Sequence, residues 1–397
     1  MKINSKPVLL SLSITFLFLF VSCGKQGTEW TGTIEETDGV TVVKNPKAPL
    51  HSENILSLEE ELSIGEAEGR EEYVFSRVRD VEVDETGRIY ALDSKEANVK
   101  VFDRDGNYIR TIGRKGQGPG ELQIPNDIYI DEKDKIYISD VENDRLSVFN
   151  KHGDFVDSFN FKEYSVSKII GVTKKDEIIL LMNTTSKESG KNFIVFDYMV
   201  NVYSPRFEFM ENLYRTTIPV MQMFTKEGKM LALSVPFQKT LCCKMDSRGN
   251  VYVAESQEYR IHIFSSDGEL IRRIEKDQVQ SKVSKQDVEN YAQEHFQEDE
   301  NERKFWSDTV KDQLKIPDYK PVFDRFYFDQ EKLLVLGHEL EENQNTFVDV
   351  FDSGGKYIGI TLLSVLPRTW KNNKVYTIEE DEEGYQVVKR YKVTWKI

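Results

Sequence analysis

The segment Arg79–Tyr90 reads RDVEVDETGRIY, and the chain repeats this pattern as NDIYIDEKDKIY at Asn126–Tyr137. The same offset of 47 residues carries Val101–Gly106 (VFDRDG) onto Val148–Gly153 (VFNKHG). Self-similarity at a fixed period of this size is typical of solenoids, propellers and other repeat architectures. The repeat therefore decides the fold class.

Further copies of the pattern lie towards the C-terminus. Val195-Phe196 keeps only the apolar pair, whereas Met245–Val253 (MDSRGNVYV), Ile263–Gly268 (IFSSDG) and Val350–Ile358 (VFDSGGKYI) keep more of it. Each copy contains short runs of alternating apolar and polar residues separated by turn residues, which predicts a four-stranded antiparallel meander. In the first copy we expect strands at about 78–83, 88–93, 98–103 and 107–112.

Such a sheet is apolar on both faces, so its copies must stack face to face. Radial stacking around a channel is the β-propeller solution, and about 45 residues per repeat is the size of one blade. We expect an all-β, six-bladed β-propeller. The expected blades are 74–113, 118–160, 164–209, 228–275, 318–363 and a sixth from about 364.

Two segments lie outside this pattern. Gly39–Lys44 is an isolated apolar run that we expect to close blade six as its outer strand, because a closed ring avoids an open sheet edge. Residues 45–73 are expected to be a surface excursion. Residues 277–316 predict a helical insert between blades four and five, acting as a rim cap or as a partner-docking element, because Ser284–Asp287 reads as a capping box before apolar residues at helical spacing.

The connector Ile112–Pro125 reads IGRKGQGPGELQIP and is followed by Asn143–Phe149, NDRLSVF. With the Asp-Gly turns, these motifs resemble the NHL repeat, and more specifically the six-bladed propeller lipoproteins of bacteria. The likeness is strongest over residues 75–160 and 241–275. It implies a propeller fold whose ligands bind at the mouth of the central channel.

The N-terminus carries a targeting pattern. Lys2 and Lys6 precede an apolar run, Val8–Val21, that is long enough for a signal peptide and short for a membrane span. The run ends in FVSCG at 20–24, which resembles the bacterial lipobox, with Phe20 where Leu is usual. We expect lipidation at Cys23, including a palmitate-type acyl chain, although an ordinary signal peptide or an uncleaved anchor would also contain such a run.

The expected organisation follows from this pattern. Residues 1–22 are a signal peptide, 23–37 a tether and 38–397 the propeller with its insert. The expected location is the bacterial cell envelope, lipid-anchored and either periplasmic or surface-exposed.

Composition restricts the partners. The 397 residues are 39% hydrophobic, 30% charged and 11% aromatic, which excludes a disordered chain and a multispanning membrane protein. The 53 basic and 68 acidic side chains give a formal net charge of −15, which disfavours nucleic acid as a partner. We expect a monomer whose partners are the membrane, through the anchor, and an envelope protein, peptide or glycan.

Counting along the repeats aligns residues at the start of each innermost strand, where the channel mouth should lie. One expected set is Arg79, Asn126, Lys168 and Asp324, and the next is Asp80, Asp127, Ile169, Cys242 and Arg325. The candidate ligand-binding residues are accordingly Arg79, Asp80, Asn126, Asp127, Lys168, Asp324 and Arg325. Arg114 and Lys115 in the connector are candidate rim contacts. Ion pairs between blades would explain the same charges without any ligand.

The chemistry stays open. No nucleophile and base pair is recognisable, and the five His are scattered without metal-ligand spacing, so we favour a binding or scaffold module over an enzyme. The alternative is a metal-dependent hydrolase or lyase of the gluconolactonase-like or amidating-lyase-like propeller type. A Ca²⁺ site built from Asp80, Asn126, Asp127 and Asp324 belongs to that alternative. Cys242 and Cys243 are expected to be unpaired thiols, because a vicinal disulfide is strained.

Overall fold

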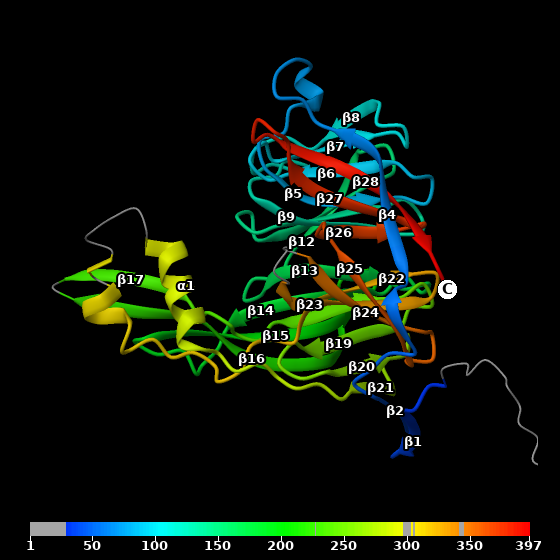
Figure 1. Cartoon of the computed structure of the whole chain (residues 1–397). Coiled ribbons are helices and arrows are strands. Elements are labelled where there is room, and N and C mark those ends of the chain that lie inside the picture. Colours follow the sequence, from blue (N-terminus) through cyan, green and yellow to red (C-terminus); the bar gives the residue numbers. More distant parts are fainter. Residues whose placement is uncertain (1–28, 227, 297–302, 305, 341–344) are drawn as a thin grey trace, which may run out of the picture.

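The computed structural model describes residues 29–226, 228–296, 303–304, 306–340 and 345–397, which form six sheets (Figure 1). Each innermost strand contacts the innermost strand of the next blade, and the last contacts the first, so the ring is closed. The innermost strands of blades one to six are β5 (Val78–Val83), β9 (Pro125–Ile130), β13 (Ser165–Val172), β18 (Leu241–Met245), β22 (Phe323–Asp329) and β26 (Pro367–Lys371).

Blades one and two follow the repeat closely. Blade one continues with β6 (Ile89–Asp93), β7 (Asn98–Phe102) and β8 (Tyr108–Ile112), so the predicted four-stranded meander is confirmed. Blade two continues with β10 (Ile136–Asp140), β11 (Arg145–Phe149) and β12 (Phe155–Asn160).

Blades four, five and six share the same order of strands. Blade four contains β19 (Val251–Glu255), β20 (Arg260–Phe264) and β21 (Leu270–Lys276). Blade five contains β23 (Lys332–Leu340), β24 (Thr346–Phe351) and β25 (Tyr357–Leu363), and blade six contains β27 (Lys374–Glu380) and β28 (Gln386–Trp395).

Blade three departs from the expected boundaries. It contains β14 (Ile178–Thr185) and the long strands β15 (Phe193–Tyr203) and β16 (Phe209–Lys226), with β17 (Lys229–Ser234) as a fifth strand. The expected start of blade four at 228 was therefore wrong, because the strands before Leu241 pair within blade three.

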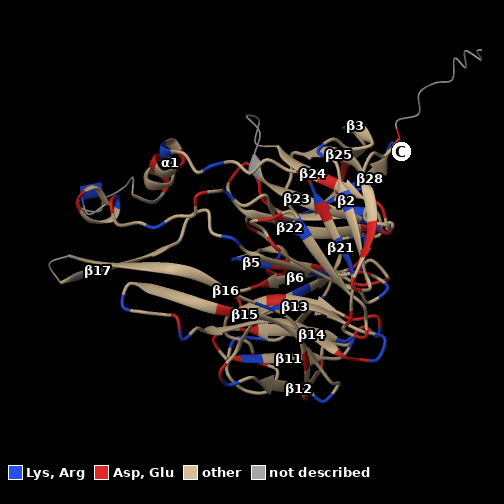
Figure 2. Cartoon of the chain, turned by 90° about the horizontal axis from the view of Figure 1, so that it is seen from below, with Lys and Arg blue, Asp and Glu red and all other residues tan. Residues whose placement is uncertain are grey.

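The ends of β16 and β17 form an arm with the segment that follows blade four (Figure 1). Helix α1 (Lys285–Phe296) and the short π-helix η2 (Trp306–Val310) pack on this hairpin through a small apolar cluster. Ser284 and Asp287 exchange hydrogen bonds at the start of α1, as a capping box does. The long strands of the arm carry few charged residues (Figure 2).

The N-terminal segment joins three blades in succession. Strand β2 (Val40–Asn45) pairs in parallel with β21 of blade four, and β1 (Thr33–Thr37), in the expected tether, forms a hairpin with β2. Strand β3 (His51–Asn54) pairs with β25 of blade five. Strand β4 (Leu56–Ile64) pairs with β28 and completes blade six, and the 3-10 turn η1 (Glu71–Tyr73) leads into blade one.

The prediction that Gly39–Lys44 closes blade six was therefore wrong, as was the surface excursion over 45–73. Strand β4 closes the blade because it buries Leu56 and Ile64 and because its acidic residues match basic residues of blade six. Glu61 pairs with Lys374 and Arg390, and Glu60 pairs with Lys389.

Two further expectations concern the termini and the thiols. Cys23 and the signal-peptide residues lie outside the described residues, and among the described helices none is long and apolar enough to cross a membrane. Cys242 and Cys243 are both free and both buried, as predicted for unpaired thiols. They pack into two different clusters, because adjacent residues of a strand point to opposite faces.

Candidate functional site

Most of the candidate residues lie where the innermost strands begin, which we call the entry end of the channel. The pairing of these strands with their neighbours skips one residue in blades one, two and five, and the extra residues are Arg79, Asn126 and Asp324. Such β-bulges re-aim a side chain and are frequent beside functional sites.

The bulges also correct the expected alignment. Asp80 Oδ2 accepts the Ile128 N–H of the next blade at 3.2 Å, and Asp127 Oδ2 accepts the Ile169 N–H at 2.7 Å. Ile169 is thus equivalent to Ile128, and the residue before it, Lys168, is equivalent to Asp80 and Asp127. Counting along the sequence was wrong by one residue here, because β13 contains two register shifts that counting does not detect.

We call the resulting level of side chains the entry ring. Blades one to five contribute Asp80, Asp127, Lys168, Cys242 and Arg325, and Arg368 reaches it from blade six.

Arg368 was missed from the sequence. Its Nε donates to Asp80 Oδ1 at 2.8 Å, which joins blade six to blade one. Arg368 is itself the extra residue of a register shift in β26, in the blade that has lost the repeat motifs. No local sequence signal marks it.

Asp127 is the most perturbed group of the entry ring. Its side chain is buried, and burial raises its pKa to about 8, with the neighbouring Asp80 carboxylate acting in the same direction. Lys168, the Ile169 N–H and Arg368 oppose this rise. At neutral pH the Asp127 carboxyl is therefore mostly protonated, whereas Asp80 forms an ion pair with Arg368.

Three cations of the entry end have no carboxylate partner among the described residues. Arg79 and Arg325 are exposed and Lys168 is half-buried, and they belong to blades one, five and three. Among the residues that the structure describes, no carboxylate lies within ion-pair distance of any of the three. The entry end therefore has more cations than ionised carboxylates, on a chain whose net charge is −15.

The other candidates make local contacts. Asn126 Nδ2 donates to Ser167 O at 3.3 Å, and Asp324 Oδ1 lies 2.7 Å from His338 Nδ1. Cys242 Sγ donates to the Asp324 carbonyl oxygen, and burial raises the pKa of this thiol to about 12, so it stays protonated.

The two rim candidates stay in their own connector. The exposed Arg114 pairs with Glu121 of the same loop at 2.9 Å, and Lys115 forms an isolated β-bridge with Leu122. The structure therefore does not bring Arg114 and Lys115 to the entry ring.

The expected Ca²⁺ ligands do not form one group. Over the described ranges, no cluster of three or more His, Cys, Asp or Glu side chains could hold a metal ion. Of the four expected ligands, Asp80 contacts Arg368 and Asp324 contacts His338.

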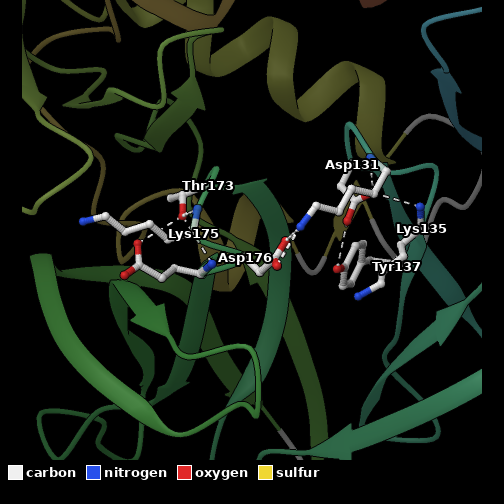
Figure 3. Close-up of polar contacts among 8 residues, drawn as sticks. Asp131, Lys135, Tyr137, Thr173, Lys175 and Asp176 are labelled. Atoms are coloured by element: carbon white, nitrogen blue, oxygen red, sulfur yellow. Dashed lines mark hydrogen bonds and ion pairs between the residues drawn. The ribbon is translucent and has the colours of Figure 1, made fainter.

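The opposite end of the channel, which we call the turn end, carries the hairpin turns between the first and second strands of each blade. Asp131 holds one turn by accepting the Lys133 and Lys135 N–H groups and the Tyr137 hydroxyl (Figure 3). The turn at Thr173 lies beside it, and the Lys133–Asp176 ion pair at 2.5 Å links the two. These hydrogen bonds and this ion pair fix the two turns, and so fix the ends of the strands that the turns connect.

A cavity of about 220 Å³ lies at the turn end, and its walls come from all six blades. It includes Glu82 of blade one and Lys244 of blade four. This cavity was not predicted from the sequence, although Glu82 lies two residues after Asp80 on the same strand and Lys244 two residues after Cys242.

Comparison with known proteins agrees with this architecture. A crystal structure of a Bacteroides fragilis protein described as a "putative exported protein" matches with a TM-score of 0.53 at 14% identity, covering 89% of this chain and 99% of that one. A member of the duf4221 family from Bacteroides vulgatus matches with a TM-score of 0.47 at 11% identity, covering 86% and 99%. Virginiamycin B lyase from Staphylococcus aureus matches with a TM-score of 0.42 at 8% identity, covering 85% and 99%.

At 14% identity the likeness to the Bacteroides fragilis protein concerns the fold alone. Among curated proteins none matches the chain. The model of the family DUF5128, described as "6-bladed beta-propeller", matches residues 40–251. Because this match spans more than half of the sequence, the chain belongs to that family of six-bladed β-propellers.

Proposed function

We propose that this protein is an NHL-like, lipid-anchored propeller of the bacterial cell envelope that binds a carboxylate-bearing ligand at its entry end. The ligand is an acidic peptide segment of an envelope protein or an acidic glycan, which share this chemistry. Propellers serve both binding and catalysis, so the charge pattern of the entry end, rather than the fold, supports the proposal.

The observation that carries the proposal is the excess of cations at the entry end. Lys168 and Arg325 have no carboxylate partner within the described part of the chain, and Asp127 adds little negative charge at neutral pH. Arginine donors suit a carboxylate because their fixed geometry allows two parallel hydrogen bonds. A ligand carboxylate would therefore supply the counter-charge that the ring lacks.

The double variant Lys168→Ala plus Arg325→Ala tests this site. Each charge-assisted hydrogen bond contributes about 1.5–3 kcal/mol, so we expect at least a 100-fold loss of affinity for acidic ligands. Binding would be measured by fluorescence polarisation with acidic and neutral peptides, and in parallel on an array of acidic and neutral glycans. The two arms distinguish the two sources of the carboxylate.

The matched control is Lys151→Ala, which removes an exposed cation from a turn of blade two. It should bind as tightly as the unmodified protein. Equal binding of acidic and neutral ligands, or undiminished binding by the double variant, would contradict the proposal.

The anchor rests on the lipobox-like sequence around Cys23 and is supported by the exported description of the Bacteroides fragilis neighbour. We expect Cys23→Ser to move the protein from the membrane fraction to the soluble envelope fraction and to abolish incorporation of an alkyne-labelled palmitate analogue. More than one acyl chain is needed for stable attachment, so the shift should be nearly complete. Ser22→Ala, which keeps the Cys, is the control; retention of the label by Cys23→Ser would rule out this lipidation site.

A further inference from the structure

We propose that the turn-end cavity is a second binding site that accepts a small zwitterion, a free α-amino acid, between Glu82 and Lys244. This site lies at the other end of the channel from the entry ring and does not depend on the function proposed above.

Two opposite charges face each other across this cavity. Glu82 is on blade one and Lys244 on blade four, which are three blades apart in a closed ring of six and so lie across the channel from each other. Both side chains line the same cavity of about 220 Å³. Within the described residues neither enters an ion pair, and Glu82 Oε1 accepts only its neighbour's N–H, that of Val83, at 3.1 Å.

Desolvation shifts the pKa of both Glu82 and Lys244. Burial is the largest influence on both: it raises the pKa of Glu82 and lowers the pKa of Lys244. Both side chains are half-buried, and each influences the pKa of the other from across the channel without forming an ion pair. A partly desolvated charge without a close partner is unfavourable. An ammonium group placed beside Glu82 and a carboxylate placed beside Lys244 would satisfy both charges at once, and an amino acid carries these two groups on one carbon.

The wall of the cavity between the two charges is partly aromatic. Tyr129, Phe328 and Trp370 line the cavity together with Thr369, so it offers apolar contact for a side chain as well as polar ends. Phe328 is held by an edge-on contact with Tyr252 at 4.8 Å between ring centroids. Ligand pockets for drug-sized molecules measure about 300–1,000 Å³, so this cavity suits a smaller molecule.

An adjoining groove gives a ligand access to the cavity. A groove of about 400 Å³ adjoins the cavity and shares Glu85, Phe328, Trp370 and Lys371 with it. At this edge Lys371 and Glu85 pair with each other at 2.9 Å across blades six and one. Lys371 is thus already paired. Of the two other lysines that line the cavity, Lys174 is exposed on the turn after β13, whereas Lys244 lies on an innermost strand across the channel from Glu82.

The test is isothermal titration calorimetry of the purified full-length chain with each of the 20 common free amino acids. We expect at least one to bind, with its amide and its N-acetyl derivative binding at least 10-fold more weakly, because each derivative lacks one of the two charges. Glu82→Gln and Lys244→Met should each weaken binding by about 10- to 100-fold while circular dichroism remains unchanged.

Control variants separate this site from the entry ring. Arg79→Ala plus Arg325→Ala, which removes two cations of the entry end, should bind the amino acid as the unmodified protein does. Loss of binding in this variant would move the ligand to the entry end and overturn the proposal. Absence of binding by all 20 amino acids would also overturn it. If Glu82→Gln or Lys244→Met fails to fold, the amide and the N-acetyl derivative decide on the unmodified protein: equal affinity for these and the free amino acid would refute the zwitterion site.

Discussion

Replacing Val388 with Asp is expected to lower the free energy of unfolding by about 4 kcal/mol or more, because it places a carboxylate without a partner in a closed apolar layer. Val388 is 1% exposed, lies opposite Ile64 of β4 and packs with Val81 and Val83 of blade one. The substitution thus acts on two contacts at once: the pairing of β28 with β4 and the packing of blade six on blade one. Urea denaturation followed by circular dichroism measures the change.

The matched control is Thr394→Asp, which introduces the same side chain at an exposed position of the same strand. Its stability should stay within about 0.5 kcal/mol of the unmodified protein, as is usual for surface substitutions. If both variants lost the same stability, strand propensity would explain the effect, and not burial between blades six and one.

Asp127→Asn is expected to remove a pH dependence of stability. Asp127 binds its proton more tightly in the folded protein, where its pKa is about 8, than in the unfolded chain, where it is near 3.9. The unfolded state therefore binds fewer protons between these values, and the stability of the unmodified protein falls as pH rises through this window. Asn keeps an oxygen that can accept the Ile169 N–H but does not ionise.

The expected result is a stability difference between Asp127→Asn and the unmodified protein that is small near pH 4 and grows by about 1.4 kcal/mol per pH unit between about pH 5 and pH 7, with the variant the more stable. Urea denaturation at four pH values measures it. Asp157→Asn, at an exposed position of the same blade, serves as the control and should show no such trend. A difference that is constant with pH would mean that Asp127 is ionised throughout.

The fold could be predicted because local sequence repeats specify each blade. The Asp-x-x-Gly turns and the alternating runs that follow them specify each hairpin within about 12 residues, so the strands of blade one were placed to within a residue of their observed bounds. The closing strand could not be chosen in this way. The apolar run at 40–43 has the better strand composition, whereas β4 contains three consecutive Glu residues. Two of these, Glu60 and Glu61, pair with basic residues more than 300 positions later.

The candidate site was predicted in part. Asp80, Asp127 and Arg325 were correctly aligned, because their blades keep the spacing between turn and strand start. Lys168 was misplaced by one position, since a β-bulge adds a residue without any change in composition. Arg368 and the turn-end pair Glu82 and Lys244 were missed because their importance depends on which blades face each other, a property of the closed ring.

The N-terminal strands also determine when folding of the chain can finish. Strands β2, β3 and β4 pair with β21, β25 and β28, so in a chain made from its N-terminus all three lack these partners until the later strands have been synthesised. Glu60 and Lys389, which meet in the last of these pairings, are 329 residues apart. Contacts between such distant residues form slowly and leave strand edges exposed meanwhile. Folding of this protein should therefore finish only after its last strand is released, and until then its open edges need protection from aggregation.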